Sequence, residues 1–370
     1  MKTIVIPRFY CGASGQKGLA NRQEIGLARA FAALGARAVV LYPAPERTTP
    51  AVEQLEPGVT VYELPALRLG SQGIYKSWDI LLQEHADAVH VVGDNALAVP
   101  GLYRFCKRHG IFFYLVMGVL HSTSERAAVR CAMDLLMRRN LAVCRKVPTY
   151  AKTPAVAQEL QALGVPCAGV MPVGLDTAII PCVPGSRAEA RRALGLDPQG
   201  KYLIFVGRLD EYKRPLELVP LLQALPGWKL VVIGKGKLAG ALQENLQTAG
   251  LADRCRLIEQ LPNEAVQVYY HACDAYINLN DAEIFGMSLL EAMYAACPPV
   301  ARHAPGPDFI IEDGVSGVLG DTLAQLAEGV LRTDEEMGFA AQKRIQEHFL
   351  WQNTAEQALQ LMKEGAKARG

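Results

Sequence analysis

The sequence lacks a charge excess of either sign. Its 370 residues include 38 lysines and arginines and 37 aspartates and glutamates, which gives a formal net charge of +1. A strongly basic balance is the usual electrostatic signature of a protein that binds nucleic acid. We therefore expect no nucleic-acid partner, although a local basic patch would escape this count.

Paired cysteines are also missing. The nine cysteines stand singly, with no C-x-x-C pair and no zinc-type spacing of cysteine and histidine. An odd, unpatterned set is typical of reduced thiols in a cytosolic protein, most of them buried. Since nothing else in the sequence asks for a metal ion or another cofactor, we expect neither.

Long apolar runs are absent as well. No stretch approaches the roughly 18 apolar residues that a membrane-spanning helix needs. The first ten residues, MKTIVIPRFY, hold too short an apolar core for a signal peptide, and Pro7 and Arg8 interrupt it. We therefore expect a cytoplasmic protein.

What the sequence does contain is an α/β pattern that occurs twice. Continuous apolar strands alternate with helix-length segments in the first half, which indicates a parallel sheet covered on both faces. The expected strands are 3–7, 36–43, 59–65, 87–93, 112–118 and 147–153. After the proline-rich bridge 179–186 the pattern restarts, with expected strands at 201–207, 229–234, 255–261, 275–280 and 298–302.

This repetition predicts two doubly wound, Rossmann-like domains, residues 1–174 and 175–350. Ligand is expected in the interdomain cleft, at the carboxyl ends of the strands. The last segment, 351–370, has apolar residues at helical spacing. It predicts a terminal helix that docks on either domain.

The stretch VGRLDEYKRP places two cations just after a predicted strand. The strand ends at Gly207, Arg208 follows at once, Lys213 comes five positions later, and a helix can begin at Pro215. Strand-end cations beside a helix N-terminus suit a phosphate or diphosphate. A solvated charged turn over 210–214 is the alternative, and both interpretations stay open.

Two glycine turns and one histidine also follow predicted strands. The turns are IGKGK at 233–237 and ASGQKG at 13–18, where Gly15 and Gly18 would let the backbone approach a ligand. Neither is a complete G-x-G-x-x-G, which counts against a dinucleotide site. His121 lies just beyond the apolar run 112–118, where a functional and a structural role are both open.

The segment DAEIFGMSLLEAM at 281–293 carries two glutamates, Glu283 and Glu291. Gly286 permits a sharp entry into a helix that begins near Met287 or Ser288, whose N-terminal amides would face an anion. Glu291 stands among apolar residues, so either it turns to solvent or a polar partner meets it. Both carboxylates are suitable acceptors for the hydroxyl groups of a sugar.

These elements, in this order, resemble the retaining glycosyltransferases of family 4. Those enzymes have the GT-B fold and share an element of two glutamates separated by seven residues, here EIFGMSLLE. The resemblance extends over VGRLDEYKRP, VVIGKGK and GVSGVLG, and more loosely over ASGQKG, DAVHVVG, TPAVAQELQALG and PVGLD in the first half. It implies transfer of a sugar from a nucleotide donor to an acceptor hydroxyl, with retention at the anomeric carbon.

The resemblance also implies roles for single residues. Arg208 and Lys213 would hold the diphosphate, Glu283 would contact the sugar, and Glu291 would bind the ribose hydroxyls. His121 would lie by the sugar and the leaving group. The other expected donor-binding residues are Gly15, Gly18, Gly207, Ile284, Phe285, Gly286, Met287 and Ser288. The donor would be a UDP- or GDP-sugar, and the first domain would bind the acceptor, a sugar, glycolipid or small molecule.

The chain departs from the family pattern at the sugar-binding loops. Ile284 and Ala296 stand where many members have glycine, and APGPDF at 304–309 replaces a common double-glycine loop. The donor sugar therefore stays open. Two other functions are also compatible with the sequence: a non-catalytic two-lobed sugar-binding protein, and a phosphorylase or epimerase of similar architecture.

One segment predicts a basic amphipathic helix, residues 124–146. Its cationic side chains are Arg126, Arg130, Arg138, Arg139, Arg145 and Lys146. Two interpretations stay open: an ordinary surface helix, and contact with an anionic membrane surface or a lipid-linked acceptor. The second would place the protein at the inner face of the cell membrane.

Overall fold

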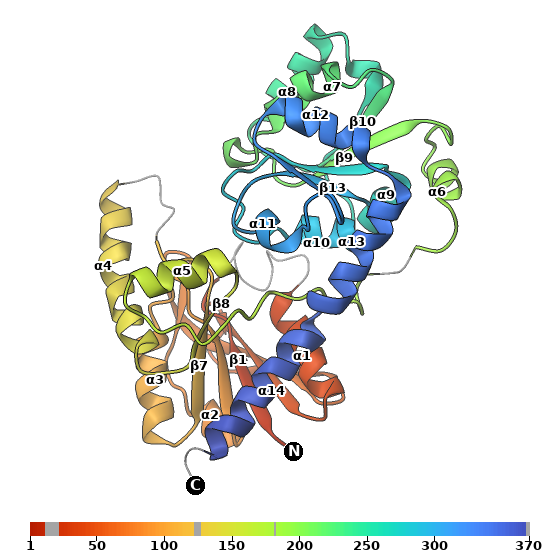
Figure 1. Ribbon diagram of the computed structural model, residues 1–370. Helices are drawn as coiled ribbons and strands as arrows, with labels where there is room; N and C mark the ends of the chain where they lie inside the picture. The colour runs from red at the N-terminus through yellow and green to blue at the C-terminus, as the bar shows by residue number, and fades with distance from the viewer. Residues whose placement is uncertain (12–21, 122–126, 181–182, 368–370) are drawn as a thin grey trace. The chain divides into compact units, whose positions relative to one another are not determined.

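The computed structural model describes residues 1–11, 22–121, 127–180 and 183–367 (Figure 1). The chain divides into two compact units. The first unit comprises Met1–Asp176 together with Leu350–Gly370, and the second unit comprises Thr177–Phe349. The C-terminal segment therefore belongs to the same unit as the N-terminus.

The first unit is built on a sheet with the strand order β3-β4-β2-β1-β6-β7-β8. Its parallel strands are β1 (Thr3–Pro7), β2 (Arg37–Ala44), β4 (Val59–Leu69), β6 (Ala88–Val92), β7 (Phe112–Met117) and β8 (Thr149–Ala151). Strand β1 pairs with β2 on one side and with β6 on the other. The chain thus winds in both directions from β1, and the β1/β6 boundary is the switch point at which such sheets bind ligands.

One edge of this sheet differs from the purely parallel arrangement that the sequence predicts. Strands β3 (Ala51–Glu56) and β5 (Gln72–Tyr75) both pair antiparallel to β4. The turn between β3 and β4 contains Gly58, whose φ of 83° suits glycine. Strand β3 is largely exposed, so it lacks the continuous apolar run that marks a buried parallel strand.

Helices cover both faces of the first sheet (Figure 1). They are α1 (Gln23–Ala33), α2 (Ile80–Gln83), α3 (Val99–Arg108), α4 (Ala127–Cys144), α5 (Pro154–Ala162) and α14 (Trp351–Lys367). The last of these packs along α1. Ala355 and Ala358 are fully buried, which lets the two helices approach closely. The sequence left open which domain the terminal helix joins, and the structure places it on the first unit.

The second unit has a wholly parallel sheet with the strand order β11-β10-β9-β12-β13-β14. Its strands are β9 (Lys201–Val206), β10 (Trp228–Ile233), β11 (Cys255–Ile258), β12 (Ala275–Asn278), β13 (Pro299–Arg302) and β14 (Val318–Gly320). Its helices are α6 (Arg187–Ala193), α7 (Leu218–Gln223), α8 (Ala239–Thr248), α9 (Asn263–Ala272), α10 (Met287–Tyr294), α11 (Pro307–Ile310), α12 (Leu323–Arg332) and α13 (Glu335–His348). Strand β9 lies between β10 and β12, so the switch point is the β9/β12 boundary.

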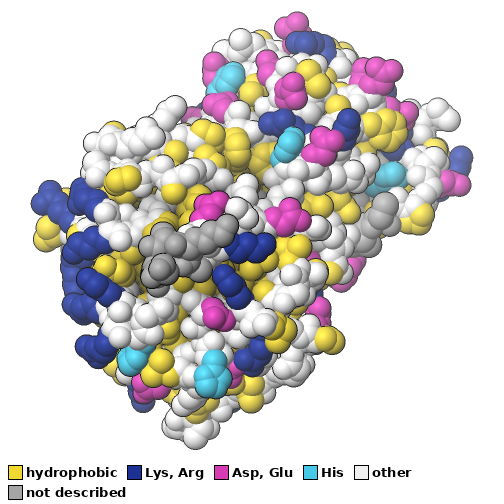
Figure 2. Space-filling model, turned by 60° about the horizontal axis from the view of Figure 1, so that its bottom comes forward, with side chains coloured by type: hydrophobic (Ala, Val, Ile, Leu, Met, Phe, Trp, Pro, Cys, Tyr) yellow, Lys and Arg dark blue, Asp and Glu magenta, His cyan; other side chains and the backbone are white. Residues whose placement is uncertain are grey.

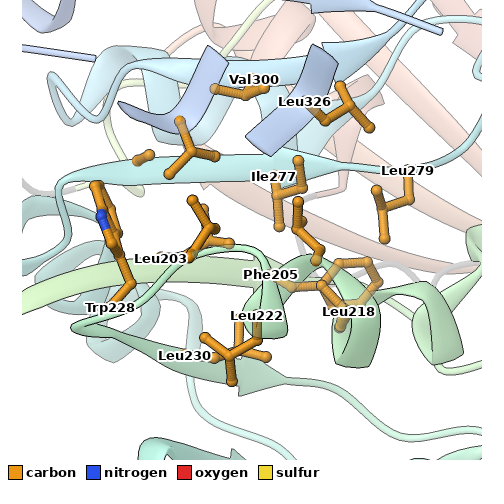
Figure 3. Close-up of a cluster of buried hydrophobic side chains, with 14 of the residues drawn as sticks. Leu203, Phe205, Leu218, Leu222, Trp228, Leu230, Ile277, Leu279, Val300 and Leu326 are labelled. Carbon is orange, nitrogen blue, oxygen red and sulfur yellow. The ribbon is translucent and has the colours of Figure 1, made fainter. Parts of the chain in front are cut away.

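A dense apolar core fixes the strands at this boundary (Figure 3). Leu203 and Phe205 of β9 and Ile277 of β12 pack with Leu222 of α7 and Leu326 of α12. Each of these side chains is at most 2% exposed. Truncating one such leucine to alanine typically costs about 2–5 kcal/mol. The ends of β9 and β12 are therefore held on a rigid support.

None of the helices in the described part of the chain combines the length and apolar composition of a bilayer span. The eight cysteines among the described residues are free, and Cys11, Cys106, Cys144, Cys273 and Cys297 are buried.

Candidate active site

The glycine turn 233–237 packs directly on the end of β9. Gly207 N donates to Ile233 O, and Leu209 N donates to Lys235 O, each at 3.0 Å. A Cβ atom at Gly234 would lie only 1.8 Å from the carbonyl oxygen of Gly207. Glycine is therefore required at 234 for the turn to close against the strand end.

Arg208 leaves this strand end and points into solvent. Its side chain is 72% exposed, and both Nε and Nη2 donate to Asp210 Oδ2, at 2.8 and 2.5 Å. Asp210 Oδ1 also accepts the Lys237 N–H at 3.1 Å. The Lys237 amide and then Arg208 hold the pKa of Asp210 below its ordinary value. Arg208 is thus held by Asp210, which the 233–237 turn holds in place through the Lys237 amide.

Lys213 makes a different contact, with Glu283. Lys213 Nζ forms an ion pair with Glu283 Oε2, although the two residues are 70 positions apart in the chain. Their side chains are 15% and 14% exposed, and Asn280 Nδ2 also donates to Glu283 Oε2 at 3.2 Å. The structure therefore brings two of the sequence-predicted residues together, at the carboxyl ends of the neighbouring strands β9 and β12.

The loop from β12 to α10 is tied down by its own polar groups. Asn278 Oδ1 accepts the N–H of Asn280 at 3.0 Å, and Glu283 O accepts the N–H of Gly306 at 2.8 Å. Gly286 has a φ of 94°, which is the left-handed region that favours glycine. The helix α10 begins at the next residue, Met287, as the sequence predicts.

The side chains at the start of α10 are engaged by the protein. Phe285 is 7% exposed, and its ring lies edge-on to that of Phe349 at 6.3 Å between centroids. Ser288 Oγ is 2.8 Å from the hydroxyl oxygen of Tyr276. Ile284 and Met287 are half-buried. The N-terminal amides of α10, rather than these side chains, are the groups suited to an anion.

Glu291 is buried on the inner side of α10. It is 8% exposed, so it does not turn to solvent. Burial raises its pKa to about 7, and the neighbouring hydroxyl group of Tyr270 in α9 opposes this rise. A carboxyl group of this kind is poised to change its charge near neutral pH.

A chain of ion pairs that the sequence analysis did not single out supports the same loop. Arg214 Nη2 lies 2.9 Å from Asp281 Oδ2, and its Nη1 lies 3.1 Å from Glu217 Oε1. Arg302, which is 8% exposed at the end of β13, also pairs with Glu217. Arg214 has a φ of 52°, a strained conformation for a residue with a side chain. Because strain and pairing depend on the folded chain, residue types alone gave no signal for this cluster.

The remaining predicted residues lie elsewhere. His121 belongs to the first unit, beyond the end of β7, where it is 64% exposed and its Nε2 lies 2.8 Å from Glu159 Oε1. Gly15 and Gly18 lie outside the described residues.

The first unit has a candidate site of its own. A cavity of about 220 Å³ lies at the carboxyl ends of β1, β6 and β7. Its charged lining residues are Arg8, Glu24, Asp94 and Lys152, and none of them was singled out from the sequence. Asp94 follows β6 and Lys152 follows β8. A position just beyond a strand is the same signal that made His121 a candidate.

Comparison with known families identifies the segment that carries the β9/β12 site. Residues 186–342 match the family model described as "Glycosyl transferases group 1". This segment is similar to that family over about two fifths of the chain. The match contains Lys213, Glu283 and Glu291.

The curated relatives include several proteins named D-inositol 3-phosphate glycosyltransferase, two of which illustrate the similarity. The protein from Mycobacterium marinum is 30% identical over 48% of this chain, and the aligned part spans 41% of that protein. The protein from Paenarthrobacter aurescens is 27% identical over 95% of this chain and 94% of its own length. The chain thus spans about two fifths of the first of these relatives and nearly all of the second.

Solved structures show the fold of the whole chain. Sucrose-phosphate synthase from Thermosynechococcus elongatus matches with a TM-score of 0.78 at 20% identity and covers 100% of both chains. Anabaena HepE in complex with UDP-glucose matches with a TM-score of 0.71 at 18% identity, covering 98% of this chain and 100% of its own. The prediction of an α/β chain with the GT-B fold is confirmed.

Proposed function

We propose that the protein is a glycosyltransferase that moves a sugar from a nucleotide-sugar donor to a hydroxyl group of an acceptor. The observation that carries this proposal is the Lys213–Glu283 pair at the β9/β12 switch point, beside the N-terminus of α10. Its position in a segment of the glycosyl transferases group 1 family supports it. The structural relative HepE binds UDP-glucose, so we propose a UDP-sugar as the first donor to test, and a GDP-sugar as the second.

The ion pair explains how the site would take up such a donor. A diphosphate can replace Glu283 as the partner of Lys213, while a sugar hydroxyl donates to the released carboxylate. The protein then exchanges one satisfied buried pair for two. Because Lys213 and the amides of α10 are already in place, little reorganisation is needed when negative charge develops on the leaving diphosphate.

We assign the other residues by the same chemistry. Arg208 would leave Asp210 to reach the diphosphate, and Glu291 would accept hydrogen bonds from the ribose hydroxyls. His121, with Gly15 and Gly18, would act beside the sugar. Retention at the anomeric carbon and independence of a metal ion belong to this proposal. Lys213, Arg208 and the helix amides together do the electrostatic work that a divalent cation does in other transferases.

The acceptor is proposed to bind to the first unit. The names of the relatives from M. marinum and P. aurescens include D-inositol 3-phosphate, a phosphorylated cyclitol. A sugar, a glycolipid or another small hydroxyl compound are the further candidates for this chain. Synthesis of a polysaccharide, glycolipid or other glycoconjugate is the proposed setting.

A second proposal concerns the surface of α3 and α4, which we call the basic face. Its exposed cationic residues are Arg104, Lys107 and Arg108 on α3 and Arg130, Arg138 and Arg139 on α4. Figure 2 shows lysine and arginine side chains gathered on its left side, where α3 and α4 lie in Figure 1. This density of positive charge favours contact with an anionic membrane surface. Arg145 is used differently, since it donates to Leu163 O and Gly164 O beyond α5.

A binding panel tests the proposed donor. The full chain is titrated with UDP, GDP and ADP and with the glucose conjugate of each, and its melting temperature is recorded. We expect one nucleotide and its sugar to stabilise the chain, because a ligand that binds only the folded state raises the melting temperature. No stabilisation by any of the six compounds would count against a nucleotide-sugar enzyme. Binding of free sugars alone would support the sugar-binding alternative.

A further inference from the structure

The cavity of the first unit lies where a doubly wound sheet binds its ligand. It opens at the carboxyl ends of β1 and β6, which flank the switch point of the sheet. All of its described lining residues come from the first unit. The chemistry of this cavity can therefore be described without reference to the second unit.

Both cations in the cavity are already neutralised there. Arg8 Nη1 lies 2.5 Å from Glu24 Oε1, and these side chains are 18% and 6% exposed. Lys152 Nζ lies 3.1 Å from Asp94 Oδ2, with side chains 16% and 15% exposed. The formal charges of these four side chains sum to zero. Among the described lining residues, the cavity thus has strong donors and acceptors but no surplus of positive charge.

His90, which also lines the cavity, does not change this balance. It is 3% exposed, and burial, assisted by the charge of Lys152, lowers its pKa to about 3. The ring is therefore neutral in the physiological range. Its Nδ1 lies 2.8 Å from the hydroxyl oxygen of Tyr114, which fixes the orientation of the ring.

The Asp94–Lys152 pair is held rigidly at the carboxyl end of β7. Asp94 Oδ1 accepts the N–H groups of Gly118 and Val119 at 2.7 and 3.1 Å. Its other oxygen faces Lys152. An ammonium group has three N–H bonds, and Asp94 uses one of them. Lys152 can therefore still donate hydrogen bonds to a ligand while the geometry of the pair stays fixed.

Apolar side chains also line the cavity. Leu27, Val116, Val173 and the aromatic ring of Trp351 contribute to it. A ligand that matches both the charged and the apolar lining residues is a ring with hydroxyl groups at its edge and C–H groups on its face. An aromatic surface and a few well-placed polar groups are the usual composition of such a site.

We propose that this cavity selects an uncharged polyhydroxylated ring, a sugar or cyclitol without a phosphate group, as the acceptor. This inference rests on the proposed function. Each hydroxyl can donate to Glu24 or Asp94 and accept from Arg8 or Lys152. A phosphate dianion would lose its water shell beside two carboxylates, and the cations that it would meet among the described lining residues are already paired.

The test compares uncharged ligands with their phosphates. The full chain is titrated in a phosphate-free buffer with D-glucose and D-glucose 6-phosphate, and with myo-inositol and its 3-phosphate. We expect at least one uncharged ring to bind about tenfold or more tightly than its phosphate, because like-charge juxtaposition disfavours the dianion. Equal or tighter binding of both phosphates overturns the inference, and so does a lack of binding by both uncharged rings.

Two variants test whether the cavity is responsible. Asp94→Asn keeps an oxygen for the two backbone N–H groups but leaves Lys152 unpaired, so the preference for the uncharged ring should shrink by about tenfold. Lys152→Gln should instead enlarge the preference, and it decides the question if Asp94→Asn unfolds. The matched control is Glu63→Gln, which removes one negative charge from the same unit at an exposed pair with Arg47. An equal shift in the control overturns the assignment to the cavity.

A nucleotide titration of the same protein separates this inference from the proposed function. Binding of a nucleoside diphosphate together with a preference for phosphorylated rings overturns the acceptor class alone. Selective binding of an uncharged ring without binding of any nucleotide contradicts the proposed transferase and leaves the ligand class of the cavity supported.

Discussion

At the scale of single residues, the two glutamates of the 281–293 segment occupy different environments. Glu283 is paired with Lys213, whereas Glu291 is buried against Tyr270. If the two carboxylates bind different parts of the donor, their replacement by glutamine should alter the binding of different ligands. Glu291→Gln should weaken the binding of free nucleoside diphosphate and of intact donor alike, by about 1.5–3 kcal/mol for a lost charge-assisted hydrogen bond.

Glu283→Gln should bind the free diphosphate at least as tightly as the wild type, because it releases Lys213. It should lose affinity for the donor sugar, or turnover. Calorimetric titration of both variants with diphosphate and with donor measures the difference. Equal behaviour of the two variants, or loss of diphosphate binding in Glu283→Gln alone, would show that the roles are assigned wrongly.

The raised pKa of Glu291 predicts a pH dependence of stability. Its pKa is about 7 in the folded chain against 4.5 ordinarily, so the unfolded chain loses this proton first as pH rises. The stabilisation that comes from tighter proton binding by Glu291 in the folded chain is complete below pH 4.5, and it is lost progressively as pH rises through 7. The free energy of unfolding should fall by roughly 3 kcal/mol relative to Glu291→Gln over this interval.

Urea denaturation at pH 4.5, 6 and 7.5, followed by tryptophan fluorescence, to which Trp228 of the second unit contributes, measures this effect. The matched control is Glu244→Gln, at an exposed position on α8. A parallel pH profile for the wild type and Glu291→Gln would contradict a raised pKa at this residue.

At the scale of elements, the loop between β12 and α10 depends on the turn that precedes α7. Arg214 holds Asp281 and Glu217 from a left-handed conformation. Strain of this kind is retained where the surroundings demand it, often at a functional site. Arg214→Gly should relieve the strain, so its melting temperature should stay close to that of the wild type.

The same variant should lower kcat/KM for the donor by roughly 10- to 100-fold, because the loop that presents Glu283 is no longer anchored. Steady-state kinetics and a thermal melt of the same sample test both statements. Wild-type kinetics in a stable Arg214→Gly variant would mean that these ion pairs do not position the site.

The basic face of α3 and α4 predicts an electrostatic interaction with membranes. The double variant Arg138→Glu, Arg139→Glu should bind anionic phospholipid vesicles at least about 30-fold more weakly, since each cation near such a surface contributes about 1 kcal/mol. The control is Arg332→Glu, Lys343→Glu, at exposed positions of the second unit. Cosedimentation with the vesicles measures binding by both double variants. Equal binding by the two would rule out the basic face as the contact.

At the scale of the whole molecule, the apolar runs were enough to predict two α/β repeats, and the resemblance to the family 4 glycosyltransferases added the GT-B fold. Strands such as Thr3–Pro7 and Lys201–Val206 are buried on both faces and carry a strong signal. The antiparallel strand Ala51–Glu56 is largely exposed and carries a weak one. Burial therefore determines which strands a single sequence reveals.

The site was predictable only in part, for a related reason. Lys213 and Glu283 each stand out locally, but their pairing depends on β9 and β12 being neighbours in the sheet. The cavity of the first unit combines residues from several strand ends, and no short motif contains two of its four charges. Its balance of charge appears only when the strands are assembled.

One measurement tests the account most directly. The full chain is incubated in EDTA with the nucleotide-sugar that binds in the panel, with and without the acceptor ring that binds best, and release of nucleoside diphosphate is followed. We predict release that requires the acceptor, survives the chelator and falls about 100- to 1,000-fold in Lys213→Ala, the loss typical of one electrostatic donor. Release without acceptor, complete loss in EDTA that Mg²⁺ or Mn²⁺ restores, or undiminished turnover in Lys213→Ala would contradict it.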